Sequence, residues 1–268
     1  MEKFDSTKHA DYAKNLPFSY FSSMASLDLT GYTFLRNNEH VIVWQDLLFP
    51  HDFPSIFVPQ NKLNWERASI AFVTPEEVGQ IKKEGIEIML DKFIENEYFY
   101  KTEALITPHS DIKRRISQFQ NSYEFEIFNS YPKEKIKEFY QFWKGQKSRD
   151  SLTFSEADEE FSKLLNILEK YDIKQVYVTV KNKLIGFTWG VAHQSGNWVG
   201  LQLKVNYEYK GLSRFLHHER AKLFSDREFF TIGTGAREVG IAQFKEELGP
   251  AYKKEYHYVL TGDKMLKK

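Results

Sequence analysis

Hydrophobic residues recur at helical spacing in two stretches of the second half of the chain. The first stretch follows Pro132 and repeats apolar residues three and four positions apart, which predicts an amphipathic helix with one buried face. The second follows Ser155, a residue type that caps helix N-termini, and should end near Tyr171. The predicted buried stripes are Ile136, Phe139, Tyr140 and Trp143 in the first helix and Phe161, Leu164, Leu165 and Leu168 in the second.

The pattern then changes to strands. Three strand candidates are joined by turn residues with no helix between them, which predicts an antiparallel meander over residues 174–180, 184–192 and 198–205. A helix should follow from Gly211 to about Ser225. Beyond it we expect a strand, a helix and a last strand, over residues 229–232, about 239–248 and 255–260. This alternation implies parallel or mixed pairing.

The first half carries weaker signals. Thr74, Pro75 and Glu77 form a capping box, so a helix should begin there and run to about Lys83. A basic helix over residues 111–119 should join the two halves and lead into an alternating segment. That segment and the other short strands are expected at residues 123–127, 41–44, 55–58 and 86–90.

Composition adds limits to this pattern. The 268 residues are 41% hydrophobic and 16% aromatic, which allows two domains with real cores. The 37 basic and 37 acidic residues balance, so a polyanion would need a local patch. With no cysteine, disulfides, thiolate nucleophiles and Cys-type metal sites are excluded. An acidic start and the lack of a long apolar run lead us to expect a soluble, cytoplasmic protein.

The order of elements from Tyr123 onward resembles the GNAT (N-acetyltransferase-like) fold: strand, helix, helix, three strands, helix, strand, helix, strand. In that family a glycine-rich turn after the fourth strand holds the donor's phosphates with the backbone amides of a helix N-terminus. The matching turn has Glu208 where the family has Gln or Arg. Either this carboxylate points away from the donor or the donor is not held as in ordinary acetyltransferases. The resemblance implies donor-binding residues at Lys210, Gly211, Leu212, Ser213 and Arg214.

Two further segments are similar to relatives of that family. Residues 244–250 look like the closing motif of the Fem-type aminoacyl-tRNA-dependent ligases, and Lys245 within them would face the donor. Residues 97–103 and 113–119 are similar to the phosphatidylglycerol lysyltransferase C-terminal domain family, in which a basic helix joins two tandem halves. This likeness implies that Arg114 and Arg115 also contact the donor.

The resemblance implies an α/β (α+β) fold class with two tandem GNAT-like (acyl-CoA N-acyltransferase) domains. Each would be a mixed central sheet flanked by helices. The expected bounds are 1–120 for an N-terminal half that ends in the basic linking helix and 121–268 for the C-terminal GNAT domain.

Catalytic signals are weak. His193 and Glu219 are the candidate general bases, although neither has a sequence context that demands the role. His217 and His218 face different ways on a helix and no partner at helical spacing completes a ligand set, so no metal site is expected. The basic residues around Gly211 form either a phosphate site or a solvated helix face.

The predicted function is transfer of an aminoacyl group from aminoacyl-tRNA to an amine or hydroxyl of a lipid, peptide or small molecule, with no permanently bound cofactor. One alternative is an acyl-CoA-dependent N-acyltransferase. A second is a degenerate, non-catalytic binding module with a GNAT fold. Aromatic residues of the first half could line the acceptor site or form that half's own core; these are Phe18, Tyr20, Phe21, Trp44 and Phe57.

Overall fold

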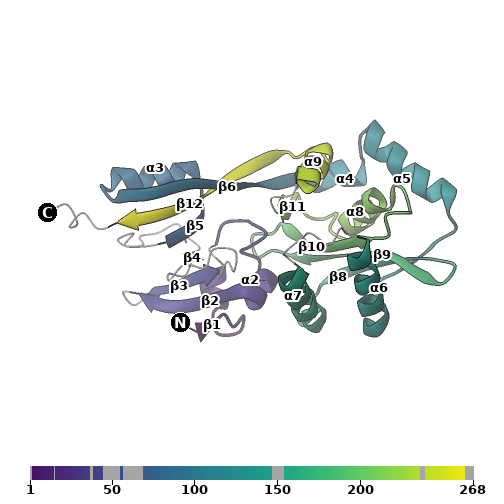
Figure 1. Cartoon of the computed structure of the whole chain (residues 1–268), viewed down its shortest axis with the longest axis horizontal. Helices are drawn as coiled ribbons and strands as arrows, with labels where there is room; N and C mark the ends of the chain where they lie inside the picture. The colour runs from purple at the N-terminus through teal and green to yellow at the C-terminus, as the bar shows by residue number, and fades with distance from the viewer. Residues whose placement is uncertain are drawn as a thin grey trace. The chain divides into compact units, whose positions relative to one another are not determined.

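The computed structural model describes residues 2–14, 16–36, 39–44, 55–56, 69–146, 154–235 and 239–262. Contacts divide the chain into two compact units, one of Met1–Phe99 with Gly233–Lys268 and the other of Tyr100–Ile232. The chain therefore leaves the first unit, completes the second, and returns to the first, as the colour ramp in Figure 1 shows. The segment from Gly233 onward packs with the beginning of the chain, although it lies in the C-terminal half of the sequence.

The second unit is a mixed sheet with helices on both faces. Its neighbouring strands follow the chain order: β7 (Glu126–Phe128), β8 (Lys174–Val180), β9 (Lys183–Ala192), β10 (Trp198–Val205) and β11 (Phe229–Thr234). The strands β7 to β10 pair antiparallel, and β10 pairs with β11 in parallel. The predicted meander and the predicted mixed pairing are confirmed.

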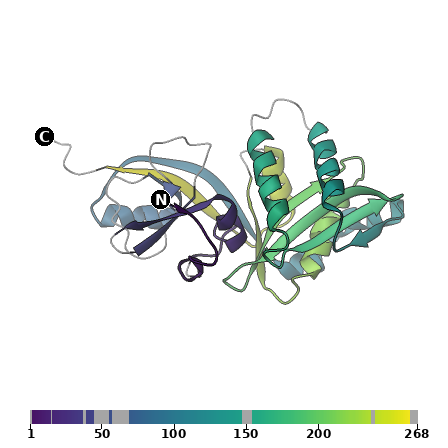
Figure 2. The ribbon, with the colours of Figure 1, turned by 90° about the horizontal axis from the view of Figure 1, so that it is seen from below.

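Helices cover both faces of this sheet. Helices α6 (Lys133–Gly145) and α7 (Phe154–Ile167) lie on one face, and α5 (Ser110–Ser122) and α8 (Leu212–Lys222) lie on the other (Figures 1 and 2). The short α4 (Thr102–Ile106) packs against α8. The structure thus has the helices that the apolar periodicity predicted, with bounds shifted by a few residues.

Aromatic rings fill the core between α6, α7 and the sheet. Tyr140 stacks on Phe161 with ring centroids 3.8 Å apart, and Phe161 stacks on Trp189 at 5.7 Å. Both predicted helical stripes are buried throughout. Trp143, Trp189 and Trp198 are buried as well, which confirms that these rings belong to the core.

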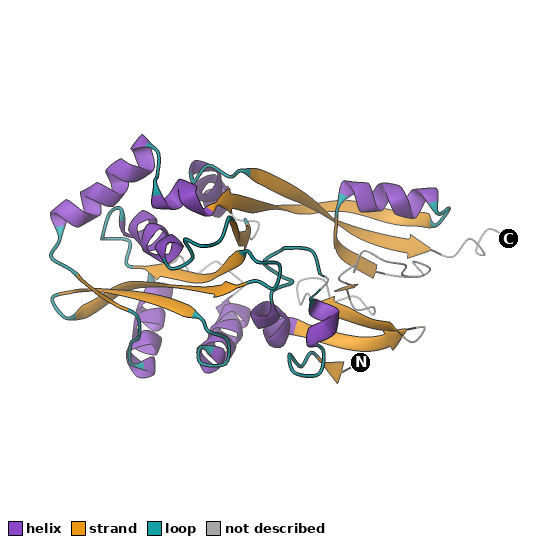
Figure 3. Cartoon of the chain, turned by 180° about the vertical axis from the view of Figure 1, so that it is seen from behind, coloured by secondary structure: helices purple, strands orange, loops and turns teal. Residues whose placement is uncertain are grey.

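The described residues of the first unit contribute strands to two sheets. In the larger one, β12 (Tyr252–Gly262) lies between β5 (Ser69–Val73) and β6 (Glu87–Lys101) and runs antiparallel to both. Figure 3 shows the long β6–β12 pair with α3 (Pro75–Lys83) beside it. The smaller sheet contains β1 (Glu2–Lys3), β2 (Gly31–Arg36), β3 (Glu39–Trp44) and β4 (Ser55–Ile56). The remaining helices are α1 (Ala10–Ala13), α2 (Met24–Thr30) and α9 (Val239–Glu247).

The start of α3 agrees with its sequence signal. The Thr74 hydroxyl accepts a hydrogen bond from the Glu77 amide, and the Glu77 carboxylate accepts one from the Thr74 amide, so the capping box is complete. In contrast, β6 extends far beyond the strand predicted at 86–90. Its later part pairs with β12 from Asp91 to Phe99, and this partner comes from a distant part of the sequence.

The aromatic residues near the N-terminus pack within the first unit. The rings of Phe18 and Phe99 meet edge to face at 5.4 Å, and Phe21 is buried. The ring of Tyr20 lies over Gly233, where it would be 3.2 Å from an added Cβ. These three residues therefore contribute to packing within their own unit, while Phe57 and the side chain of Trp44 lie outside the described part of the structure.

Candidate active site

The two parallel strands of the second unit pair over a short stretch and then part. Within the described residues, the register of β10 with β11 comprises two pairs, Trp198 with Phe230 and Val199 with Thr231. The strand β10 nevertheless continues to Val205 in register with β9. The C-terminal part of β10 therefore follows β9 and not β11. Where two strands separate, their facing backbone N–H and C=O groups do not pair with each other. A ligand could form hydrogen bonds with these groups instead.

A β-bulge lies where β10 leaves its pairing with β11. Gly200 pairs with Gly190, and the next pair joins Gln202 to Trp189, so Leu201 is an extra residue in β10. Bulges are frequent beside active sites because they redirect a strand and change which backbone groups are paired. The bulge and the parting of the strands thus mark the same segment of β10 as a candidate site.

The turn after β10 brings the chain to the N-terminus of α8. Gly211 is the N-cap residue of α8 and has a φ of 89°, a conformation that L side chains rarely adopt. The Leu212 amide, one of the predicted donor contacts, already donates to the Tyr209 carbonyl at 3.2 Å. A phosphate contact at this helix end would therefore use the next amides of the first turn, those of Ser213 and Arg214.

Helix α5 lies directly against this turn. A Cβ atom at position 211 would collide with the carbonyl oxygen of Arg115 and lie 3.2 Å from the Cβ of Phe119. The structure therefore brings together two segments that were predicted separately as donor contacts. It also provides a structural reason for Gly211 that does not depend on any ligand.

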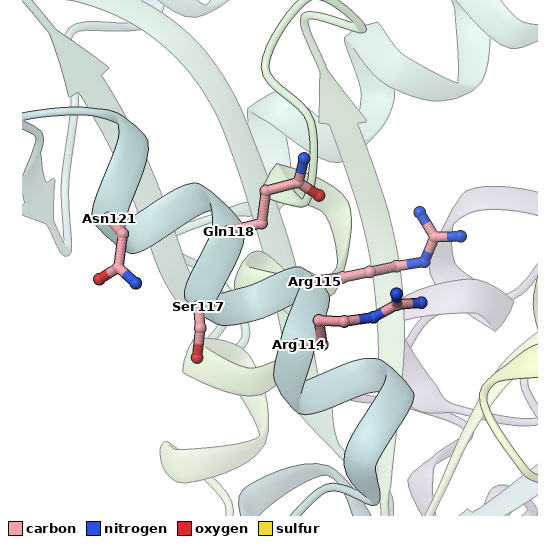
Figure 4. Close-up of a pocket in the computed structure, with 5 residues that line it drawn as sticks. All are labelled: Arg114, Arg115, Ser117, Gln118 and Asn121. Carbon is pink, nitrogen blue, oxygen red and sulfur yellow. The ribbon is translucent and has the colours of Figure 1, made fainter.

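The outer face of α5 carries a pocket of about 510 Å³. It is lined by Arg114, Arg115, Ser117, Gln118 and Asn121. The two guanidinium groups extend from the helix toward the same side (Figure 4). Arg114 lies 3.5 Å from Asp111 in an exposed ion pair, which is a weak interaction in water. Guanidinium and amide groups at this spacing offer several donors to an anion.

Glu208 is hydrogen-bonded within the turn that precedes α8. Its carboxylate accepts a hydrogen bond of 3.4 Å from the Asn206 side chain, and its amide donates to the Asn206 side-chain oxygen at 3.0 Å. The Asn206 amide in turn donates to the Ile185 carbonyl. The exposed Glu208 is thus tied to the first residue of the turn, three residues before Gly211.

The predicted base His193 lies at the other end of β10 from Gly211. It precedes the strand, whose 8 residues span roughly 25 Å. Its Nδ1 accepts a hydrogen bond of 3.0 Å from the Ser195 amide and lies 2.9 Å from the Ser195 hydroxyl. His193 is buried and organises the β9–β10 turn. The structure does not bring this residue together with the predicted donor turn, and its role as a base remains a prediction.

The predicted base Glu219 lies about two helical turns after Gly211 on α8. Its carboxylate accepts a hydrogen bond of 2.7 Å from Lys222. The neighbouring His218 ring lies 2.7 Å from the Leu105 carbonyl, which ties α8 to α4. Across the described residues, no cluster of three or more His, Cys, Asp or Glu side chains could hold a metal ion.

The remaining predicted donor contacts differ in exposure. Lys210 is exposed, whereas Arg214 is buried and lies 3.4 Å from the Ser213 hydroxyl. Lys245 belongs to the first unit, where it is buried, donates to the Thr234 carbonyl and lies 5.9 Å from the centre of the Tyr98 ring. Its ammonium group therefore has partners within its own unit.

Sequence reasoning counted Arg220 among the basic residues around Gly211 but missed its burial. The residue is 1% exposed, and its guanidinium reaches β9 and β10 beside the bulge. Helical spacing could have indicated this burial, because Arg220 lies on the same helix face as the buried residues Leu216 and His217. That pattern alone does not separate a buried arginine from one whose head group reaches water.

These features define a mixed sheet with parting parallel strands, a bulge and a helix N-terminus, which is the GNAT-like fold. No protein-family model and no curated protein matches the sequence. Among solved structures, the chain is similar to a conserved protein of unknown function from Bacteroides thetaiotaomicron VPI-5482, with a TM-score of 0.80 and 12% identity. That match covers 97% of this chain and 98% of the other.

Two further solved structures share the fold over most of the chain. The C-terminal domain of a putative lysylphosphatidylglycerol synthetase from Agrobacterium fabrum matches with a TM-score of 0.59 and 11% identity, covering 95% of this chain and 92% of that domain. FemX matches with a TM-score of 0.59 and 11% identity, covering 96% of each chain. The predicted resemblance to these two groups is confirmed at the level of the fold. Among the described residues, no helix is both long and apolar enough to cross a bilayer.

Proposed function

We propose that this protein is a GNAT-type acyltransferase that moves an aminoacyl group from aminoacyl-tRNA to an amine or hydroxyl of a lipid, peptide or small molecule. The observation that carries the proposal is the contact between α5 and the Gly211 turn. The helix that carries the pocket of Arg114 and Arg115 therefore also packs against a helix N-terminus. Guanidinium groups and helix amides are both suited to the phosphates of an RNA end. Such a donor also implies that the protein acts in the cytoplasm.

The chemistry needs little covalent machinery. An aminoacyl ester is already activated, so the protein must hold the donor, orient the acceptor amine and stabilise the oxyanion that forms on the carbonyl. The parted end of β10, with its bulge, is the segment that we assign to the donor's acyl end. His193 or Glu219 would accept the proton of the attacking amine or hydroxyl. Collapse of the tetrahedral intermediate then breaks the ester C–O bond, and the same proton passes to the ribose hydroxyl of the tRNA as it leaves.

We also propose that the chain is a tandem arrangement of GNAT-like halves, 1–120 and 121–268, linked through α5. In this arrangement the second half returns β12 to the sheet of the first unit, which is why the compact units have other bounds than the halves.

An acyl-CoA donor is the second candidate. The Gly211 turn at the start of α8 favours it, because the amides of Ser213 and Arg214 could hold a pyrophosphate at this helix N-terminus. A non-catalytic module is the third candidate. The engagement of the Leu212 amide with Tyr209 favours that reading, since it leaves fewer amides for a phosphate.

The test is donor binding at several salt concentrations. Purified protein would be titrated with tRNA charged with a mixture of labelled amino acids, with the same tRNA after deacylation, and with acetyl-coenzyme A. We expect the charged tRNA to bind best. Replacing both arginines (R114E with R115E) should weaken tRNA binding and lower the slope of log K against log salt by about 2.

The matched control is the double variant K135E with K137E on α6, which changes the net charge by the same amount. Both lysines are exposed helical cations with an acidic partner three residues away, as Arg114 is, but their helix lies on the opposite face of the sheet. The control should leave tRNA affinity and its salt slope unchanged. Equal losses of tRNA affinity in both variants would mean that overall charge, and not the pocket, drives binding. Binding of acetyl-coenzyme A alone would favour the second candidate.

A further inference from the structure

A fully buried arginine holds the bulge of β10 from beneath the sheet of the second unit. Arg220 comes from the last turn of α8, and the residue is 1% exposed. One terminal nitrogen, Nη1, donates to the Thr188 hydroxyl at 2.7 Å, to the Trp189 carbonyl at 3.1 Å and to the Gln202 carbonyl at 3.3 Å. The charged group thus joins β9 to β10.

These acceptors lie directly after the point where the register changes. Trp189 and Gln202 form the first pair after the extra residue Leu201, and Thr188 is the next residue of β9. The Thr188 hydroxyl also donates to the Gln202 carbonyl at 2.9 Å. A bulge leaves backbone carbonyls poorly paired, and a buried cation satisfies them strongly because the surroundings have a low dielectric constant.

Two facing glycines make room for this side chain. A Cβ at Gly200 would lie 2.5 to 2.7 Å from Nη2, Cζ and Nη1 of Arg220. A Cβ at Gly190, the cross-strand partner of Gly200, would lie 2.9 Å from Phe224 and 3.2 Å from Cδ of Arg220. The two missing side chains form a slot across β9 and β10 that the arginine fills.

The second terminal nitrogen of the guanidinium is also fixed. Nη2 lies 2.9 Å from Nδ1 of His217, one turn earlier on α8. An arginine can only donate, so this histidine nitrogen accepts and carries no proton. The ring of Trp198, at the start of β10, lies 5.4 Å from the guanidinium carbon. The side chain is therefore held from α8 and from both strands, and it cannot shift without disturbing the bulge.

We propose that Arg220 is a positioning residue that fixes the bulge and, with it, the parted end of β10; this inference rests on the proposed function. The arginine touches neither donor nor acceptor in this role. It acts through the backbone of residues 200–205, the segment that we assign to the acyl end of the donor. Loss of the guanidinium should loosen this segment while the outer strand β8 stays as it is.

The first measurement is amide hydrogen exchange, which needs no substrate. We expect R220M to speed exchange over residues 198–205 by at least about tenfold while β8 is unchanged, because buried acceptors lose their donor. R220K should recover part of the protection, since an ammonium can still donate to the carbonyls. The control F139L, a core change on α6, should raise exchange more broadly. A broad rise in R220M, or none, would overturn the proposal.

Two less disruptive variants test the same proposal if R220M does not fold. T188V removes one acceptor, and Gly200→Ala pushes the guanidinium out of its slot, so both should loosen the same segment. Gly145→Ala is the matched glycine control, because no atom lies within 4 Å of its added Cβ. If these two milder variants leave exchange over 198–205 at the wild-type rate, the proposal fails.

The second measurement is transfer kinetics at a temperature where every variant is folded. We expect R220M to lower kcat by at least about tenfold with little change in the acceptor KM, and R220K to restore part of it. If R220M has an unchanged kcat but a lower thermal stability, Arg220 has a purely structural role and the inference is overturned. If the wild-type protein transfers nothing, the proposed function itself fails, and the exchange data then report on the bulge alone.

Discussion

The carbonyl oxygen of Arg115 on α5 occupies the place where a Cβ of residue 211 would be. Gly211 is also in a left-handed conformation at the N-cap of α8. A glycine at this turn is therefore required by packing and by backbone geometry together. Replacing it would disturb the fold whether or not a donor binds there, so loss of activity in such a variant is no evidence for a phosphate site.

Gly211→Ala should be markedly destabilising. The left-handed conformation costs about 1–2 kcal/mol for a non-glycine residue, and the collision with α5 should add about 1–3 kcal/mol. Gly196→Ala is the matched control, because Gly196 has a φ of 90° with no atom within 4 Å of its added Cβ. Urea unfolding of both variants would isolate the contact with Arg115. Equal losses of unfolding free energy would mean that α5 can move away from the added Cβ at little cost.

Glu97→Gln should destabilise the first unit. The Glu97 carboxylate is fully buried and accepts hydrogen bonds from the Ser19 hydroxyl at 2.7 Å, the Tyr20 amide at 2.6 Å and the Tyr256 hydroxyl at 2.8 Å. Gln has one acceptor oxygen in place of two, and its NH₂ group would face the donors that now bind the carboxylate. We therefore expect the free energy of unfolding to fall by about 2–4 kcal/mol.

Tyr256→Phe is the graded comparison for Glu97→Gln. It removes one of the three donors and keeps the carboxylate, so its loss should be about 1–2 kcal/mol. Burial, together with the charge of Glu97, raises the pKa of Tyr256 well above its ordinary value, so the phenol stays a donor at any working pH. Chemical unfolding followed by Trp fluorescence and far-UV dichroism would measure both variants. A larger loss for Tyr256→Phe would contradict this account of the cluster.

Stability should depend on pH through His257. Burial tends to lower the pKa of His257, but hydrogen bonds and charge from Glu255 and Asp91 outweigh it, so the net pKa is raised. The ring nitrogens lie 2.6 Å from Asp91 and 2.8 Å from Glu255, and Lys82 on α3 lies 3.8 Å from Asp91. A raised pKa adds stability below the ordinary value, and this is lost as pH rises through the folded value.

His257→Gln measures this effect. The difference in Tm between the wild-type protein and the variant should be largest near pH 5 and shrink toward about pH 8. Asp91→Asn, which removes one of the two carboxylates, should reduce the same pH dependence without abolishing it. A difference in Tm that grows as pH rises would show that the imidazolium is not the favoured form in the folded protein.

The capping box of α3 offers a simpler test. Thr74→Ala removes the acceptor for the Glu77 amide and should cost about 1 kcal/mol. Thr107→Ala is the control, since the Thr107 hydroxyl donates to the exposed Glu103 carboxylate and caps no helix N-terminus. Thermal unfolding should show a clear loss for the first variant and little change for the second.

Local patterns determined much of the second unit. The stripe of Ile136, Phe139, Tyr140 and Trp143 predicts α6. Turn residues between strand candidates predict β8 to β10, because side chains and turns a few residues apart decide these elements. The capping box of α3 could also be predicted from the sequence, because its two residues are three positions apart. The order of these elements was sufficient to indicate a GNAT-like fold.

Only the tertiary structure decided the features that join distant segments. The length of β6 depends on β12, a partner more than 150 residues away in the sequence. The contact of Gly211 with Arg115, the slot of Gly190 and Gly200, and the burial of Arg220 likewise involve residues that are neighbours only after folding. His193 and Gly211 were predicted for one site, yet the length of β10 separates them. Sequence periodicity reports which face of an element is buried, whereas the atoms that meet across that face depend on how the elements pack.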